Sequence, residues 1–214
     1  MQIDSLDTLF LHELKDAYDF EHRILDGLEE MEKAADAKPL AQAFRQHHEQ
    51  TRRQIERLEK VFEECGESPE REPCDGIQGI LKEGAEIAGA KGDPAAKDAA
   101  LIGAAQRVEH YEIAAYGTLR AFAEQLGFAR SAKLLQETLD EESETDERLT
   151  RLAVENVNRQ AAAEGGRRGE SRAEDDGTEG MTKEELYEKA KELGVEGRSQ
   201  MSKEELAEEV GARR

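Results

Sequence analysis

Apolar side chains recur at helical spacing in four long stretches, which begin near residues 5, 39, 94 and 129. In the first stretch the recurring residues are Leu9, Leu14, Ala17, Tyr18, Leu25 and Leu28. In the second they are Leu40, Phe44, Ile55, Leu58 and Phe62, and in the fourth they are Leu135, Leu139 and Leu149. This spacing predicts amphipathic helices that each bury one face.

Helix start and stop signals bound these stretches. Ser5 is a suitable N-cap for the first helix, and Pro39 fits the start of the second. Asp93 and Pro94 form a cap and a first position for the third helix, which Gly127 ends. The fourth helix is predicted over residues 129–157, and a shorter one over about 76–90.

The connections between the helices predict the topology. Helices of about 26 to 31 residues are ~40–46 Å long. Short turns join the first helix to the second and the third to the fourth, so each pair is an antiparallel hairpin. Nearly thirty residues, roughly 66–93, separate the second helix from the third, which is long enough to cross the bundle. We therefore predict an all-α, ferritin-like four-helix bundle with a long crossover that carries the short helix.

The composition changes after residue 162. The stretch "EGGRRGESRAEDDGTEG" combines glycine and charge without a large apolar residue, so residues 163–180 are predicted to be a flexible linker. Residues 181–214 form a separate helix-loop-helix module, in which Thr182 and Ser202 each precede "KEEL" as a capping box. Its small size predicts marginal stability. Residues 1–162 form the bundle.

Charge and composition exclude several classes of function. A formal net charge of −20 argues against a general binder of nucleic acid or anionic membranes. No signal peptide and no apolar run of membrane-spanning length is present, so we expect a soluble, cytoplasmic protein. Cys65 and Cys74 lack the spacing of a metal site, and we expect free thiols, although their closeness in one loop also allows a disulfide.

Acidic residues interrupt the apolar faces near the middle of the helices. In "RVEHYEIAAYGTL", Glu109 and Glu112 lie three residues apart on one helical face among apolar neighbours. The equivalent polar positions of the other three helices are Glu21, His47 with Gln50 and Gln54 beside it, and Glu142 with Asp146. In a four-helix bundle these groups would meet in one layer.

Buried carboxylates need a partner, because burial of an unpaired charge is costly. No Lys or Arg lies on the inward face of the first, third or fourth helix, so a salt bridge lacks a cation there. A dinuclear carboxylate site satisfies the pattern, and several carboxylates with few histidines suit iron or manganese. The alternative is that Glu21 lies on a boundary by chance and that His47 is an ordinary core histidine.

The same segments resemble a known family. "DAALIGAAQRVEHYEIAAYGTLRAFAEQLG", "SAKLLQETLDEE" and "LAVENVN" are similar to the YciE/YciF ferritin-like stress proteins. The similarity continues through "LFLHELKDAYDFEHRIL" and "LAQAFRQHHEQTRRQIERLE", so it covers roughly residues 3–160. The resemblance implies a ferritin-like fold, a homodimer, two bound metal ions and a role in stress response, and the family is often described as ferroxidases.

Residue by residue, the resemblance places family acids at Glu21, Glu109, Glu112, Glu142 and Asp146, and a family histidine at His47. One position departs. The family commonly reads His-Leu-Glu-Glu-Thr where this chain reads "HHEQT", so Gln50 replaces an expected carboxylate. A neutral amide is a poorer ligand for a hard cation, which implies that one side of the metal site is weakened.

The C-terminal module resembles the small N-terminal domain of the Rho termination factor and SAP domains. Domains of that kind often contact nucleic acid. Residues 181–214 contain nine acids and seven bases, a net charge of 7 − 9 = −2. This balance argues against strong phosphate binding and leaves three alternatives: a protein partner, a weak nucleic-acid contact through Lys191, Arg198 and Lys203, or a passive module.

Three functional hypotheses follow. The first is a di-iron protein, with manganese as the alternative metal, that oxidises Fe(II) with O2 or peroxide. Tyr116 or Tyr18 would then bind a ligand or donate an electron. The second is a non-enzymatic, dimeric stress protein with a vestigial metal site. The third is an adaptor in which the C-terminal module is the working part.

Overall fold

The structure is a computed structural model that describes residues 3–163 and 180–211. The bundle contains α1 (Leu6–Ala34), α2 (Lys38–Cys65), α3 (Asp75–Ala88), α4 (Pro94–Leu126) and α5 (Ala129–Leu152), which continues into a π-helical turn at Ala153–Val157. The second unit contains α7 (Lys183–Glu192), a 3₁₀ turn (Arg198–Gln200) and α8 (Lys203–Gly211). The chain separates into compact units of Met1–Ala162 and Ala163–Arg214. Residues 164–179, most of the predicted linker, lie outside the described residues.

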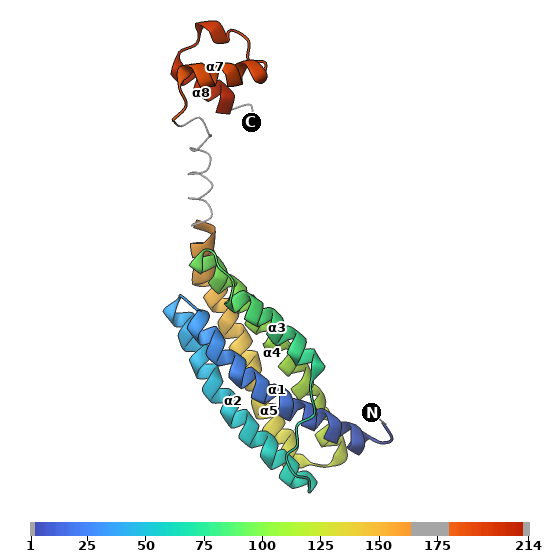
Figure 1. Cartoon of the computed structure of the whole chain (residues 1–214). Helices are drawn as coiled ribbons and strands as arrows, with labels where there is room; N and C mark the ends of the chain where they lie inside the picture. The colour runs from blue at the N-terminus through green and yellow to red at the C-terminus, as the bar shows by residue number, and fades with distance from the viewer. Residues whose placement is uncertain (1–2, 164–179, 212–214) are drawn as a thin grey trace. The chain divides into compact units, whose positions relative to one another are not determined.

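Four long helices and one short helix form the bundle. α1 packs against α2, and α4 packs against α5, so each predicted hairpin is present. The hairpins face each other through α2 with α5 and α1 with α4, while α3 covers α1 and α4 (Figure 1). The connection from α2 to α4 runs along the bundle. The described residues contain no strand, which agrees with the predicted all-α class.

The helix boundaries follow the sequence signals. Ser5 and Thr8 form a reciprocal capping box, and the Asp93 carboxylate accepts a hydrogen bond from the Ala96 amide. α2 and α4 end at Gly66 and Gly127, with φ of 74° and 82°. These left-handed conformations favour glycine because it has no Cβ. The π-helical turn after α5 was not predicted.

The buried face of α1 agrees with the predicted one only in part, at Leu14, Ala17 and Leu28. Phe10, Phe20 and Ile24 are fully buried, whereas Leu9, Tyr18 and Leu25 are only half-buried. Apolar residues occur on two adjacent stripes of this helix, and the spacing alone does not rank them. α1 contacts α2, α3 and α4, so it buries a wide face. The predicted Leu14, Ala17 and Leu28 lie in that face, whereas Leu9, Tyr18 and Leu25 lie at its margin.

A buried carboxylate anchors the crossover to α1. Asp19 accepts hydrogen bonds from the Cys74 amide at 3.0 Å, from Arg71 Nε at 2.9 Å and from Arg23. Burial would raise the pKa of Asp19, but these bonds outweigh that effect and hold the pKa below its ordinary value. Cys65 and Cys74 are free thiols in the structure.

A second buried carboxylate closes the turn between α1 and α2. Asp98 of α4 accepts from the Asp36 amide at 2.9 Å and from the Ala37 amide at 2.7 Å. We expect Asp98→Ala to lower the free energy of unfolding by about 2–3 kcal/mol, because it leaves two amides without their acceptor. Asp98→Asn keeps one acceptor oxygen and should cost less. Urea unfolding of both variants tests this, and equal losses would show that the hydrogen bonds are not the cause.

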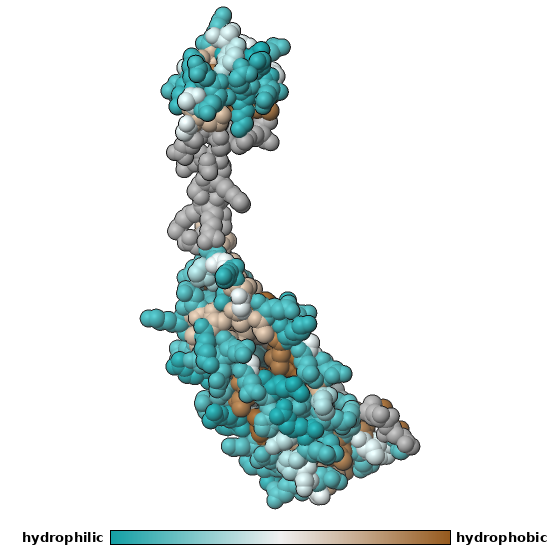
Figure 2. Space-filling view, viewed as in Figure 1, coloured by the Kyte–Doolittle hydropathy of each residue, from teal (hydrophilic) through white to brown (hydrophobic). Residues whose placement is uncertain are grey.

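The second unit has its own small core. Leu186, Ala190, Val195, Leu206 and Val210 are buried together. The Thr182 capping box is present, and Ser202 and Glu205 exchange the same pair of bonds. The visible surface of each unit is mainly hydrophilic (Figure 2). No helix in the described ranges combines the length and the apolarity that a bilayer crossing requires.

Candidate metal centre

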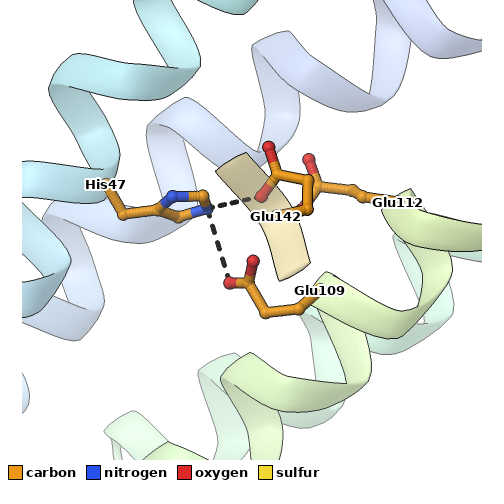
Figure 3. Close-up of side chains that lie close together, drawn as sticks. All are labelled: His47, Glu109, Glu112 and Glu142. Carbon is orange, nitrogen blue, oxygen red and sulfur yellow. Dashed lines mark ion pairs between the residues drawn. The ribbon is translucent and has the colours of Figure 1, made fainter. Parts of the chain in front are cut away.

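Four predicted ligands meet inside the bundle. His47 comes from α2, Glu109 and Glu112 from α4, and Glu142 from α5 (Figure 3). Each offers one ligand atom, and these atoms all lie within 4.8 Å of one another. All four residues are at most 2% exposed. The inward faces of three helices therefore converge on one small volume.

The candidate ligand atoms face one another, but most of them form no hydrogen bond with one another. His47 Nε2 lies 3.4 Å from Glu109 Oε1 and 3.6 Å from Glu142 Oε2. His47 Nε2, Glu109 Oε2, Glu142 Oε2 and both oxygens of Glu112 have no hydrogen-bond partner within the described chain. Buried polar atoms rarely remain unpaired. A cation between them would satisfy all of them, so the donor set fits a metal.

Electrostatics supports the same interpretation. Burial raises the pKa values of Glu109 and Glu112 well above the ordinary value, and repulsion from Glu142 raises them further. Burial also raises the pKa of Glu142, although His47 and hydrogen bonds partly offset that effect. Without a cation, protons must neutralise part of this cluster. With a cation, the carboxylates can all ionise.

Glu21 of α1 lies beside the four-residue cluster. Its Oε1 accepts a short hydrogen bond from the Tyr116 hydroxyl, and its Oε2 is unpartnered in the described structure. Burial and then repulsion from Glu142 raise its pKa well above the ordinary value. Glu21 is thus a fifth unsatisfied group next to the cluster, and Tyr116 is its neighbour. Tyr18 instead donates to Glu59 at 3.1 Å, away from the centre.

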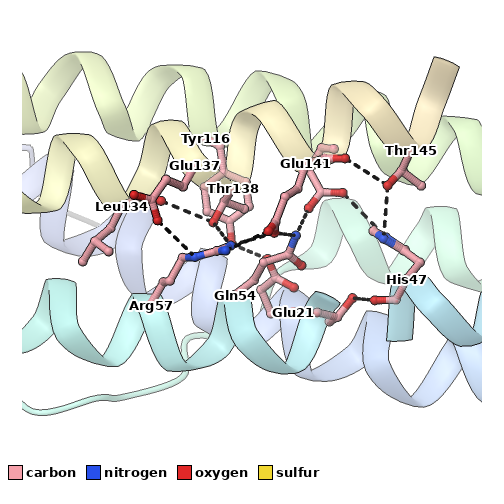
Figure 4. A network of polar contacts seen from close by, with 12 residues as sticks. Glu21, His47, Gln54, Arg57, Tyr116, Leu134, Glu137, Thr138, Glu141 and Thr145 are labelled. Atoms are coloured by element: carbon pink, nitrogen blue, oxygen red, sulfur yellow. Dashed lines mark hydrogen bonds and ion pairs between the residues drawn. The ribbon is translucent and has the colours of Figure 1, made fainter. Parts of the chain in front are cut away.

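A polar network that includes Gln54, Arg57 and Glu141 connects α2 to α5 beside the centre (Figure 4). Gln54 donates a short hydrogen bond to Glu142 and another, of 3.2 Å, to Glu141. Arg57 binds Glu141 through two hydrogen bonds of 2.7 Å each. This bidentate pair holds the Glu141 pKa below its ordinary value against the effect of burial. Arg57 is therefore occupied by Glu141, and Gln54 orients Glu142.

Thr145 orients the histidine. Its hydroxyl donates to the Glu141 carbonyl at 2.9 Å, so the oxygen can accept from His47 Nδ1, which lies 3.5 Å away. A proton on Nδ1 leaves the lone pair of Nε2 directed at the carboxylates, as a metal ligand requires. Thr145 stands three residues after Glu142, at the position that the histidine would occupy in a Glu-x-x-His pair of a ferritin-like dinuclear site.

Besides Glu21, two predicted site residues, Gln50 and Asp146, lie outside the four-residue cluster. The Asp146 side chain is 20% exposed, accepts from Gln106 at 2.9 Å and lies 3.3 Å from His110 Nε2. The inward orientation predicted for it is therefore incomplete. Gln50 is half-buried and lines a small cavity that also contacts His47 and Glu109. It lies at the edge of the site. The four-residue cluster therefore remains complete although Gln50 replaces a carboxylate.

Sequence reasoning missed the roles of three supporting residues, Gln54, Arg57 and Thr145. The helical spacing places Gln54 beside His47 but does not show what it binds, and Arg57 reaches the site from α2. The three-residue spacing from Glu142 to Thr145 was a usable signal. It is easily overlooked because threonine is not a metal ligand of the expected type.

Two protein families match the chain. Residues 5–162 match the family described as "Domain of unknown function (DUF892)", and residues 179–210 match "Rho termination factor, N-terminal domain". Protein YciF of Escherichia coli is 44% identical over 162 residues, which are 75% of this chain and 98% of YciF.

Solved structures agree with the fold of the bundle. The crystal structure of the E. coli stress protein YciF matches with a TM-score of 0.70 at 44% identity, over 72% of this chain and 98% of that one. YcfI from Rhodopseudomonas palustris, described as a putative structural protein, matches with a TM-score of 0.68 at 41% identity, over 70% and 95% of the two chains.

Proposed function

This chain belongs to the DUF892 family, as a homologue of the E. coli stress protein YciF, and from that premise we propose that its bundle binds two iron ions and oxidises Fe(II) with O2 or peroxide. Manganese is the alternative metal. The observation that carries the proposal is the convergence of unpartnered ligand atoms from His47, Glu109, Glu112 and Glu142.

Two overlapping sets of residues would hold the proposed ions. His47, Glu109, Glu112 and Glu142 would supply one imidazole and three carboxylates to the first ion, a set typical of iron and manganese. Glu21 would join Glu112 and Glu142 at a second ion, beside Tyr116. This second set contains no imidazole, so we expect the second ion to bind more weakly. Bound Fe(II) would supply the electrons that reduce the oxidant.

Metal binding should stabilise the bundle. An ion that binds the folded state at a concentration about 1,000 times its dissociation constant adds about 4 kcal/mol to the free energy of unfolding. For a domain of this size we expect the melting temperature to rise by roughly 10 °C. Anaerobic thermal unfolding with Fe(II) or Mn(II) measures the rise, and elemental analysis of the same samples gives the number of ions.

His47→Ala and His48→Ala form a matched pair for this test. The two histidines are adjacent in sequence, but His47 faces the cluster, whereas His48 lies near Glu29 and Glu49. His47→Ala should remove most of the metal-induced stabilisation, and His48→Ala should retain it. Unchanged melting of the natural sequence in the presence of either metal would contradict the proposed function.

A second candidate is a structural role. It is favoured by the description of the relative YcfI as a putative structural protein. In that case the chain would act as a homodimer in stress response without turnover, and the C-terminal module would bind a partner. Protein purified without chelator should then contain little iron or manganese. Binding assays with and without residues 181–214 test the part played by the module.

A further inference from the structure

A narrow apolar cleft leads from the surface to the metal centre. It lies between α1, α3 and α4, and its walls include Ile24, Ile80, Leu81 and Val108. Twelve of its fifteen lining residues are apolar or glycine, and the three others are Glu30, His47 and Glu109. Glu30 is exposed, whereas His47 and Glu109 are buried, so the polar groups lie at the outer rim and at the inner end.

Small residues create the cleft. Gly84 of α3 faces Ala104 of α4, and a Cβ added to Gly84 would lie 3.9 Å from the Ala104 Cβ. At Gly27 the walls are closer, since an added Cβ would lie 3.3 Å from Leu81 Cδ2. Larger side chains at these positions would fill the space. The cleft therefore depends on a few glycines and alanines where α3 covers α1 and α4.

The inner end of the cleft contains unsatisfied groups. His47 Nε2 and Glu109 Oε2 are buried and have no hydrogen-bond partner in the part of the chain that the structure describes. These atoms are also proposed metal ligands. A molecule that travels along the cleft would thus arrive directly at the metal centre.

Size and polarity restrict what can enter. The cleft has room for only a few water-sized molecules. Its apolar walls cannot replace the hydration shell of a cation, so a metal ion would lose much of its hydration energy there. Dioxygen is small and apolar and loses little on leaving water. An aliphatic chain would require the walls to move apart.

A separate cavity offers a polar route to the same residues. It lies between α2 and α5, and its walls combine Gln50, Thr145 and Arg148 with three apolar residues and with His47 and Glu109. Its amide, hydroxyl and guanidinium groups can hydrogen-bond to water or peroxide. A mainly apolar opening and a more polar one therefore meet at His47 and Glu109.

We propose that the apolar cleft admits dioxygen to the metal centre, while polar oxidants enter through the cavity beside Gln50. This proposal rests on the proposed function, because it names the route of one of its oxidants. It assigns to α3 a role that packing alone does not explain. The small residues at Gly84 and Ala104 keep a passage open.

Dissolved dioxygen is itself a probe of the cleft, because it is paramagnetic. In metal-free, full-length protein under oxygen pressure, the methyl protons of Ile24 and Ala105, which line the cleft, should relax faster than those of Leu40 and Val61, which are buried to a similar extent but do not line it. Ala104→Leu should reduce this difference. Equal relaxation of both groups in the natural sequence would overturn the proposal, whether or not the protein binds metal.

The second measurement is the rate of Fe(II) oxidation with each oxidant. Ala104→Leu should slow oxidation by O2 by roughly five-fold or more, because the added carbon atoms occupy the passage, while oxidation by hydrogen peroxide stays nearly unchanged. Ala114→Leu makes the same change at an exposed position of α4 and should alter neither rate. If Ala104→Leu slows both oxidants equally, the separate routes are wrong.

A second variant covers the case in which Ala104→Leu fails to fold. Ala85 is exposed at the outer part of the cleft, so Ala85→Leu narrows the opening without adding volume to the core. It should slow O2 selectively in the same way. Failure to bind iron at all would refute the proposed function instead, and the relaxation experiment would still decide whether dioxygen enters the cleft.

Discussion

The double variant Glu109→Gln with Glu112→Gln is expected to bind no iron or manganese and to have a metal-free bundle at least as stable as the natural one. Both carboxylates belong to the four-residue cluster, and together they provide two of its three negative charges. A neutral amide is a weak ligand for a hard cation. Oxidation of Fe(II) in the bundle should therefore be lost with metal binding.

The double variant should lose metal binding but not stability, because repulsion between the buried carboxylates destabilises the natural bundle when no metal is bound. Burial and mutual repulsion raise the pKa values of both groups well above the ordinary value, so ionisation at neutral pH opposes folding. Glutamine keeps the shape of the side chain and removes the charge. Replacement of buried charges by neutral groups of similar volume often leaves stability unchanged or raises it by about 1–4 kcal/mol.

A matched control separates this effect from the general loss of two charges. Glu83 and Glu86 of α3 are also three residues apart, but both are exposed. Glu83→Gln with Glu86→Gln should preserve metal binding and barely change stability. Metal content and urea unfolding in EDTA measure both quantities. If the Glu109/Glu112 variant still binds two ions, the ligand assignment is wrong. If the variant does not fold without metal, the two carboxylates are needed for folding.

Most of the cluster could be predicted from sequence because helical spacing specifies which residues share a face. Glu109 and Glu112 lie on the buried face of α4, and His47 and Glu142 occupy similar positions on α2 and α5. Asp146 was less predictable. Four residues on a helix correspond to about 400°, so Asp146 is rotated by about 40° from Glu142. That rotation moves it from the centre towards the surface, where it meets Gln106 and His110.

Contacts between helices could not be predicted in the same way. The pairing of Arg57 with Glu141, and the hydrogen bond from Gln54 to Glu142, depend on how far α2 and α5 are shifted along each other. Spacing within one helix contains no information about that shift. The cleft was unpredictable for the same reason, since Gly84 and Ala104 meet only because α3 lies over α4.

The metal-free bundle is expected to lose stability as the pH rises above the ordinary pKa of a glutamate side chain, about 4.5. The groups responsible are the four carboxyls at and beside the centre whose pKa values burial raises: Glu21, Glu109, Glu112 and Glu142. When the pH lies between the pKa of such a group in the unfolded chain and its higher pKa in the folded chain, the group holds a proton only in the folded state. Rising pH therefore favours unfolding for as long as the four carboxyls together hold more protons in the folded state than in the unfolded state.

Other carboxyls destabilise the bundle when the pH falls too far. The pKa values of Asp19, Glu64 and Glu141 are lowered in the folded state, because hydrogen bonds outweigh burial. These three carboxyls contribute to the free energy of unfolding when the pH is above their pKa in the unfolded chain. That contribution is lost as the pH falls through their lower pKa values in the folded chain. Below about pH 4.5 their protonation destabilises the bundle. We therefore expect the metal-free protein to be most stable in mildly acidic solution.

Metal should reverse the slope between about pH 5 and pH 8. The ligands must be deprotonated to bind, so affinity rises with pH, and the stabilisation by Mn(II) rises with it. Urea unfolding at three pH values across this range, under argon, with EDTA or with Mn(II), measures both slopes. The Glu109→Gln/Glu112→Gln variant should have a flatter profile in EDTA and no response to Mn(II). A natural bundle that gains stability with rising pH in EDTA would mean that its buried carboxyls find partners other than protons or a metal.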